Sequence, residues 1–139
     1  MPEVFADTGY WIGLLNPRDQ LHNIALNLRR SLSDQRIVTT EMVLTELLNH
    51  ASNRGAEMRL GAANMVNGLI REAGITIIPQ TTRLFRVALE RYRARPDQAW
   101  SIVDCASFIV MEERGIREAL AFDRHFEQAG FTVLLRDSD

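Results

Sequence analysis

The stretch Trp100-Ser101-Ile102-Val103-Asp104-Cys105-Ala106-Ser107-Phe108-Ile109-Val110-Met111 places a carboxylate in the first turn of an apolar helix. Residues 106–111 are apolar apart from Ser107, which predicts that this helix lies inside the protein. A buried helix rarely carries an acid unless the acid has a partner. Ser101 and Asp104 have the spacing of a capping box, and by itself this makes Asp104 a helix cap. Other acids would have to reach the same place to give it a chemical role.

The composition is typical of one globular domain, and we expect residues 1–139 to form it. Apolar residues make up 46% and charged residues 24%, which is ordinary for a soluble protein. No apolar run is long enough to span a membrane, and no signal-peptide pattern opens the chain, so we expect a cytoplasmic location without membrane contact. The single cysteine, Cys105, excludes an internal disulfide and cysteine-rich zinc sites.

The charges permit RNA binding without predicting it. All 16 basic residues are arginine, and the formal net charge is −2. Arginine makes two-point contacts with phosphate and with carboxylate groups. If four acids were committed to a metal site, the rest of the chain would carry a small positive charge.

Short apolar segments alternate with amphipathic ones. This alternation predicts a parallel β-sheet with helices on both faces, hence an α/β fold. Asp19 and Thr40 are placed to cap the second and third helices. The expected strands are 3–6, 36–39, 75–78, 119–122 and 131–135, and the expected helices are 10–15, 19–32, 40–53, 56–72, 81–93 and 101–114.

Four acids can meet at one edge of that sheet. Asp7 and Asp123 directly follow apolar strands, and ligands of open α/β sheets bind beyond the carboxyl ends of the strands. Asp104 lies in a first helical turn, and Glu46 occupies a helix position where an apolar residue is expected. Each acid has a simple structural explanation alone: a turn, a cap, or an ion pair with a neighbour such as His50 or an arginine. Their joint placement at one edge is harder to explain in that way.

Gathered carboxylates repel one another unless a cation lies among them. Oxygen ligands without histidine or cysteine suit Mg²⁺ or Mn²⁺. Such an ion lowers the pKa of a bound water and polarises phosphoryl oxygens. The predicted chemistry is therefore metal-assisted hydrolysis of a phosphodiester. We interpret His22, His50 and His125 as structural, because they lack metal-ligand spacing.

The four acidic segments resemble those of the PIN-domain ribonucleases, and most closely the VapC-type toxins of bacterial toxin–antitoxin pairs. The similarity runs along nearly the whole chain. Gly9 and Ala121 depart from the family pattern, which often has serine and threonine there, but neither departure removes an acid. The matching segments are Phe5-Ala6-Asp7-Thr8-Gly9, Thr39-Thr40 through Val43-Leu44-Thr45-Glu46, Trp100 to Phe108, and Ala121-Phe122-Asp123-Arg124-His125-Phe126 with Gly130-Phe131.

The resemblance implies a three-layer α/β/α fold with a central parallel sheet of about five strands. It also implies a Mg²⁺- or Mn²⁺-dependent endoribonuclease, an antitoxin that blocks its site, and a homodimer. The catalytic metal ligands would be Asp7, Glu46, Asp104 and Asp123, with Thr8 and Ser101 as hydrogen-bonding partners behind them. Candidate RNA contacts are Arg124, Arg83, Arg86 and Arg93, with Arg91 and Arg95 beside them.

Other functions fit the sequence less well. Asp7-Thr8-Gly9 spells an aspartic-protease signature, but those enzymes are rich in β-structure. A phosphotransfer receiver domain needs a lysine, which this chain lacks, and a haloacid-dehalogenase-type phosphatase needs an acid where Gly9 stands. A free-standing PIN-type RNA-processing nuclease and a non-catalytic metal-binding signalling or interaction module remain open alternatives.

Overall fold

A five-stranded parallel sheet forms the centre of the computed structural model, which describes residues 2–136. The strand order is β3-β2-β1-β4-β5. The prediction of an α/β fold around about five parallel strands is confirmed. The strands are β1 (Glu3–Ala6), β2 (Arg36–Thr40), β3 (Ile75–Ile78), β4 (Glu118–Leu120) and β5 (Thr132–Val133).

The position of β1 determines where a ligand can bind. It pairs with β2 on one side, with Val4 opposite Ile37, and with β4 on the other, with Phe5 opposite Ala119. The chain proceeds from β1 to β2 and β3, and then returns to β4 and β5 on the other side of β1. This reversal creates a crevice at the carboxyl ends of β1 and β4, which is the usual ligand site of such sheets.

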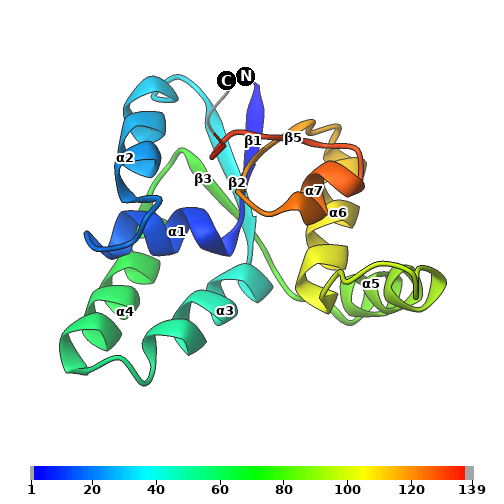
Figure 1. Ribbon diagram of the computed structural model, residues 1–139, viewed down its shortest axis with the longest axis horizontal. Coiled ribbons are helices and arrows are strands. Elements are labelled where there is room, and N and C mark those ends of the chain that lie inside the picture. Colours follow the sequence, from blue (N-terminus) through cyan, green and yellow to red (C-terminus); the bar gives the residue numbers. More distant parts are fainter. Residues whose placement is uncertain (1, 137–139) are drawn as a thin grey trace.

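Helices cover both faces of the sheet. In Figure 1, α1, α2 and α4 lie on one side and α5, α6 and α7 on the other, while α3 extends below the carboxyl end of β2. The expected three-layer α/β/α arrangement is confirmed. None of the helices in residues 2–136 has the length and apolar character needed to cross a membrane. The helices are α1 (Thr8–Leu15), α2 (His22–Ser31), α3 (Glu41–Ala51), α4 (Ala56–Arg71), α5 (Thr82–Ala94), α6 (Ile102–Arg114) and α7 (Arg124–Gln128).

Helix α6 forms part of the core, as its sequence predicts. Every residue from 105 to 111 is buried. The Phe108 ring packs edge-on against Trp100 and Phe126, with ring centroids 5.1 Å apart in both pairs. This aromatic packing fixes the start of α6 against α7, and therefore fixes the acid in its first turn.

Several local details differ from the predictions, and strand β5 spans only Thr132–Val133 rather than residues 131–135. The five-residue helix α7 was not expected, because a helix so short shows no periodicity. Strand β4 ends at Leu120 rather than at residue 122. Asp19 does not cap α2, whose N-cap is Leu21. The Asp19 carboxylate instead accepts a hydrogen bond from the Leu21 N–H, and so closes the turn before the helix.

The apolar side chains of α5, which recur at helical spacing, are only partly covered. Leu84 and Ala88 are buried against the rest of the protein. Phe85, Leu89 and Tyr92 instead remain 41%, 45% and 52% exposed. One apolar face of this helix therefore contacts nothing among the described residues that would shield it from water.

Candidate functional site

Asp7 is held where β1 ends and α1 begins. Its backbone N–H donates to the Leu120 carbonyl over 3.1 Å, which ties the end of β1 to the end of β4. Behind it, the buried Thr39 hydroxyl donates to the Ala6 carbonyl over 2.9 Å. The Trp11 indole N–H donates to the same hydroxyl over 3.3 Å. The carboxyl group of Asp7 is thus positioned by contacts to β2, β4 and α1.

Glu46 approaches from α3. The Thr40 hydroxyl caps this helix by accepting a hydrogen bond from the Val43 N–H over 3.0 Å, as its sequence predicts. Glu46 lies two turns further along, and its Oε1 accepts a 2.5 Å hydrogen bond from the Thr8 hydroxyl. Thr8, next to Asp7, therefore joins the carboxylate of α3 to the start of α1.

Asp104 has the predicted cap and also a second contact. The Ser101 hydroxyl accepts a hydrogen bond from the Asp104 N–H, and Asp104 Oδ2 accepts one from the Ser101 N–H, each over 3.0 Å. The capping box is therefore confirmed. The same Oδ2 lies 2.8 Å from Nδ1 of His125.

Asp123 and His125 complete the group from the start of α7. Asp123 caps this helix by accepting a hydrogen bond from the His125 N–H over 3.0 Å. The His125 ring places Nδ1 3.4 Å from Asp123 Oδ1 as well as close to Asp104. His125 thus lies between two of the acids, a position that the sequence analysis did not foresee. The only available signal was its location two residues after Asp123.

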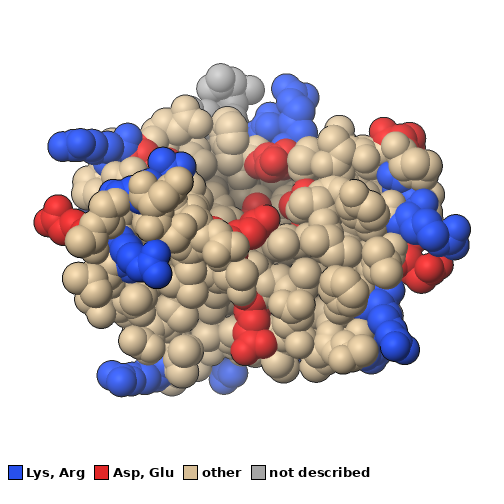
Figure 2. Space-filling model, turned by 90° about the horizontal axis from the view of Figure 1, so that it is seen from below, with Lys and Arg blue, Asp and Glu red and all other residues tan. Residues whose placement is uncertain are grey.

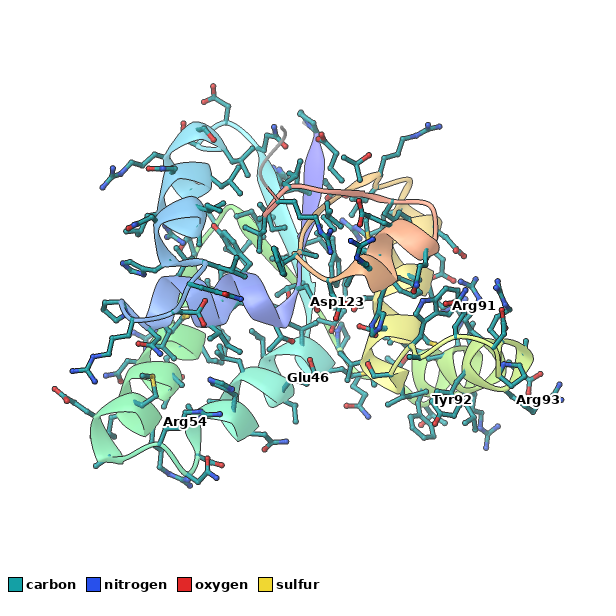
Figure 3. The ribbon with its side chains drawn as sticks, viewed as in Figure 1. Glu46, Arg54, Arg91, Tyr92, Arg93 and Asp123 are labelled. Carbon is teal, nitrogen blue, oxygen red and sulfur yellow. The ribbon has the colours of Figure 1, made fainter. Side chains whose placement is uncertain are left out.

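All four acids line one cleft of about 790 Å³. Figure 2 shows acidic side chains gathered in the hollowed middle of this face, with basic side chains mostly around its outline. In Figure 3, Glu46 and Asp123 reach toward the same region from different parts of the fold. The cleft lining also includes Thr8, Ser101, Phe122, Arg124, His125, Gln128 and Arg136.

The arginines expected to contact RNA fall into two groups. Arg124 lines the cleft. Arg83, Arg86 and Arg93 lie on α5 and do not line it. Two of these three form surface ion pairs, Arg83 with Glu113 and Arg93 with Glu90. Only Arg124 among these candidates is therefore next to the acids.

Burial and neighbouring charges raise the proton affinity of Asp7 and Glu46. The pKa of Asp7 is raised to about 7, mainly by burial and also by the negative charges of Asp104, Glu46 and Asp123, while the hydrogen bond from the Thr8 backbone opposes the rise. Burial, together with the charge of Asp104, also raises the pKa of Glu46, although the hydrogen bond from Thr8 opposes this. The cleft is therefore a place where positive charge is strongly favoured.

The chemistry of these donors fits a hard cation, because all four are carboxylates. As the side chains stand, no three histidine, cysteine or acidic groups within residues 2–136 are close enough together to hold a metal ion. A bound ion would therefore have to draw carboxylates inward, or contact some of them through water.

The chain belongs to the PIN-domain family, whose domain matches residues 4–132. This match confirms the resemblance stated from the four acidic segments.

Similarity to individual proteins agrees with this family assignment. The chain is 33% identical over 131 residues to the 23S rRNA-specific endonuclease VapC20 of two Mycobacterium tuberculosis strains, CDC 1551 and H37Rv. The matched region covers 92% of this chain and 95% of each relative. The crystal structure of M. tuberculosis VapC20, described as a Sarcin-Ricin loop cleaving toxin, superposes with a TM-score of 0.80 at 31% identity. That superposition covers 93% of this chain and 96% of the other.

Proposed function

We propose that this protein is a metal-dependent endoribonuclease that acts as the toxin of a toxin–antitoxin pair. The observation that carries the proposal is the convergence of four carboxylates on one cleft at the carboxyl ends of β1 and β4. Membership in the PIN-domain family and similarity to VapC20 along nearly the whole chain support it.

Asp7, Glu46, Asp104 and Asp123 would hold one or two Mg²⁺ or Mn²⁺ ions. Such an ion supplies Lewis acidity toward a phosphoryl oxygen and makes a water molecule more acidic. The chain's own hydrogen bonds orient these carboxylates: Thr8 holds one oxygen of Glu46, and the Ser101 N–H and His125 hold Oδ2 of Asp104. The remaining carboxylate oxygens are then available for a cation and for the attacking water.

The substrate would be RNA, with the scissile phosphate in the cleft. Arg124 and Arg136 line the same cleft and provide positive charge for a polyanion. Ribosomal RNA is the first substrate to test, because VapC20 is named for its action on 23S rRNA.

Two protein partners belong to this proposal. An antitoxin would bind the toxin and block the cleft. A second copy of the chain would form a homodimer, and the exposed apolar face of α5 with Phe85, Leu89 and Tyr92 offers a surface that it could cover.

Sedimentation of the wild-type protein and of the Leu89→Glu variant tests the dimer. We expect a dimer that the substitution dissociates, and a monomeric wild-type protein would contradict the dimer.

Purified protein tests the enzymatic part of the proposal. We expect it to cut RNA with Mg²⁺ or Mn²⁺, to stop when a chelator is added, and to resume when the metal is restored. Cleavage that continues in a chelator would contradict metal dependence.

Expression in a bacterial host tests the role as a toxin. We expect growth to halt, and to resume when a small protein encoded next to this one is co-expressed. Active RNA cleavage without any growth effect would favour the free-standing RNA-processing nuclease.

A further inference from the structure

Glu46, His50 and Arg54 follow one another at intervals of four residues along and just beyond α3. Four residues advance a helix by about 6 Å on nearly the same face, which relates Glu46 to His50; Arg54 lies in the turn after the helix ends at Ala51. Arg54 Nη2 lies 3.4 Å from Nδ1 of His50, so these two side chains are in contact. In Figure 3, Glu46 lies near the centre of the molecule and Arg54 lies far out toward the turn between α3 and α4. A row of side chains thus leads outward from the acidic cleft.

The row ends in a second hollow of about 510 Å³ between the end of α1 and the start of α4. Arg18 and Arg54 line it, with Glu57 as the single carboxylate. Both arginines are exposed. Within residues 2–136, neither has a carboxylate oxygen within 4.0 Å. The hollow therefore offers positive charge that the protein itself does not neutralise.

Most arginines of α5 differ from these two because they are paired. Arg83, Arg91 and Arg93 are each paired with a glutamate, and Arg95, which follows the helix, is paired with Asp97. A phosphate would have to compete with these carboxylates for the guanidinium groups. Among the described residues of α5, Arg86 is unpaired but lines neither the cleft nor this hollow, whereas Arg18 and Arg54 line the hollow on the α3 side.

His50 stands between Glu46 and Arg54 in this row, and it lines neither the cleft nor the hollow itself. Burial and the neighbouring Arg54 lower its pKa, although the charge of Asp19 opposes this. The imidazole is therefore neutral near pH 7, with Nδ1 accepting from Arg54 and the ring hydrogen on Nε2. A neutral ring with one N–H can donate to a phosphate oxygen or to a base edge.

We propose that the RNA strand leaves the cleft along α3, with Arg54 and Arg18 binding its backbone phosphates two or more nucleotides from the scissile bond. His50 donates a hydrogen bond to the intervening nucleotide. The interval of about 6 Å between Glu46 and His50 in α3 is close to the spacing of successive nucleotides in an extended strand. This inference rests on the proposed function, because it takes RNA as the substrate.

Binding of a single-stranded RNA of about 12 nucleotides, measured in a chelator at several salt concentrations, tests the proposal without cleavage. We expect Arg54→Gln and Arg18→Gln each to weaken binding about fivefold and to reduce the salt dependence by about one phosphate contact. Arg71→Gln is the matched control. Arg71 is also exposed but lies at the opposite end of α4, and we expect its loss to change affinity less than twofold.

Cleavage of RNA substrates of two different lengths provides a second test of the proposal. Arg54→Gln should lower kcat/KM about fivefold on the 12-nucleotide RNA and leave it unchanged on a dinucleotide, whose single phosphodiester is the scissile bond. Equal losses of kcat/KM on both RNA lengths would overturn the proposal. Equal effects of Arg54→Gln and Arg71→Gln on RNA binding would overturn it as well. It would also fail if Arg54→Gln weakened binding of a protein partner but not of RNA. A wild-type protein that binds RNA but cuts neither length would contradict the proposed function instead.

Discussion

At the scale of residues, Asp7 has the most strongly altered chemistry in the site. Its pKa is about 7 in the folded protein, against an ordinary value of 3.8. Between about pH 4 and 7 the folded state therefore holds a proton that the unfolded chain has lost. The free energy of unfolding consequently falls as the pH rises through this range, and it stays reduced above it. The acidic site destabilises the metal-free protein at neutral pH.

Asp7→Asn should therefore stabilise the metal-free protein. Asparagine keeps the shape of the side chain but carries no charge, so we expect a gain of about 1–3 kcal/mol at pH 8 that vanishes toward pH 4. Denaturant unfolding at both pH values in a chelator measures the gain. Asp97→Asn, which breaks only an exposed ion pair with Arg95, should give no gain. A less stable Asp7→Asn protein at pH 8 would contradict this explanation.

The four acids could be predicted from sequence because each stands at a recognisable position. Asp7 and Asp123 follow apolar strands, and Asp104 completes a capping box with Ser101. His125 could not be predicted in the same way. Its contact with Asp104 joins residues 21 positions apart and depends on a short helix without periodicity.

At the scale of elements, local signals in the sequence predicted where helices and strands form. They predicted less well what packs against each element. Thr40 and Ser101 act as caps because capping depends on only a few neighbouring residues. The α5 stripe shows the limit of such signals. Periodicity indicates which residues share a face, but it does not indicate what covers that face. Phe85 and Leu89 consequently remain exposed.

Two glycines of α1 provide a matched test of how this helix is positioned. A Cβ at Gly13 would lie 3.3 Å from both the Ala25 Cβ and the Leu21 carbonyl oxygen, whereas a Cβ at Gly9 would lie 3.9 Å from a Leu21 methyl group. We expect Gly13→Ala to destabilise the protein by about 1–3 kcal/mol through overpacking. Gly9→Ala should leave the free energy of unfolding unchanged or raise it by up to about 1 kcal/mol.

Thermal unfolding of both glycine variants measures these effects. Equal effects of the two substitutions would show that close packing of α1 on the turn before α2 does not constrain the helix.

At the scale of the whole molecule, the strand order brings the acids together. The sequence predicts parallel strands, but it does not by itself specify the order β3-β2-β1-β4-β5 that places the end of β1 beside that of β4. The family resemblance provided the architecture, because long-range pairing leaves no local signal. The convergence of the acids is thus a property of the complete fold.

Binding of a cation should stabilise the whole molecule, because the folded state gathers the acids and the unfolded chain does not. At 100 times its dissociation constant, a single bound ion would add about 2.7 kcal/mol. We expect Mn²⁺ or Mg²⁺ to raise the Tm of the wild type at pH 7, and to raise that of Asp7→Asn much less. An equal rise in both proteins would place the ion elsewhere.

Cleavage of RNA by Asp104→Asn, compared with wild type and with Asp97→Asn under saturating Mn²⁺, tests the central claim most directly. Asparagine can still accept the Ser101 N–H, so the cap and the fold should survive, which circular dichroism can verify. We expect Asp104→Asn to lose cleavage by more than about 100-fold, because one of the converging charges is removed. Asp97→Asn should cut at the wild-type rate. Full metal-dependent cleavage by a folded Asp104→Asn protein would contradict the assignment of this cleft as the catalytic site.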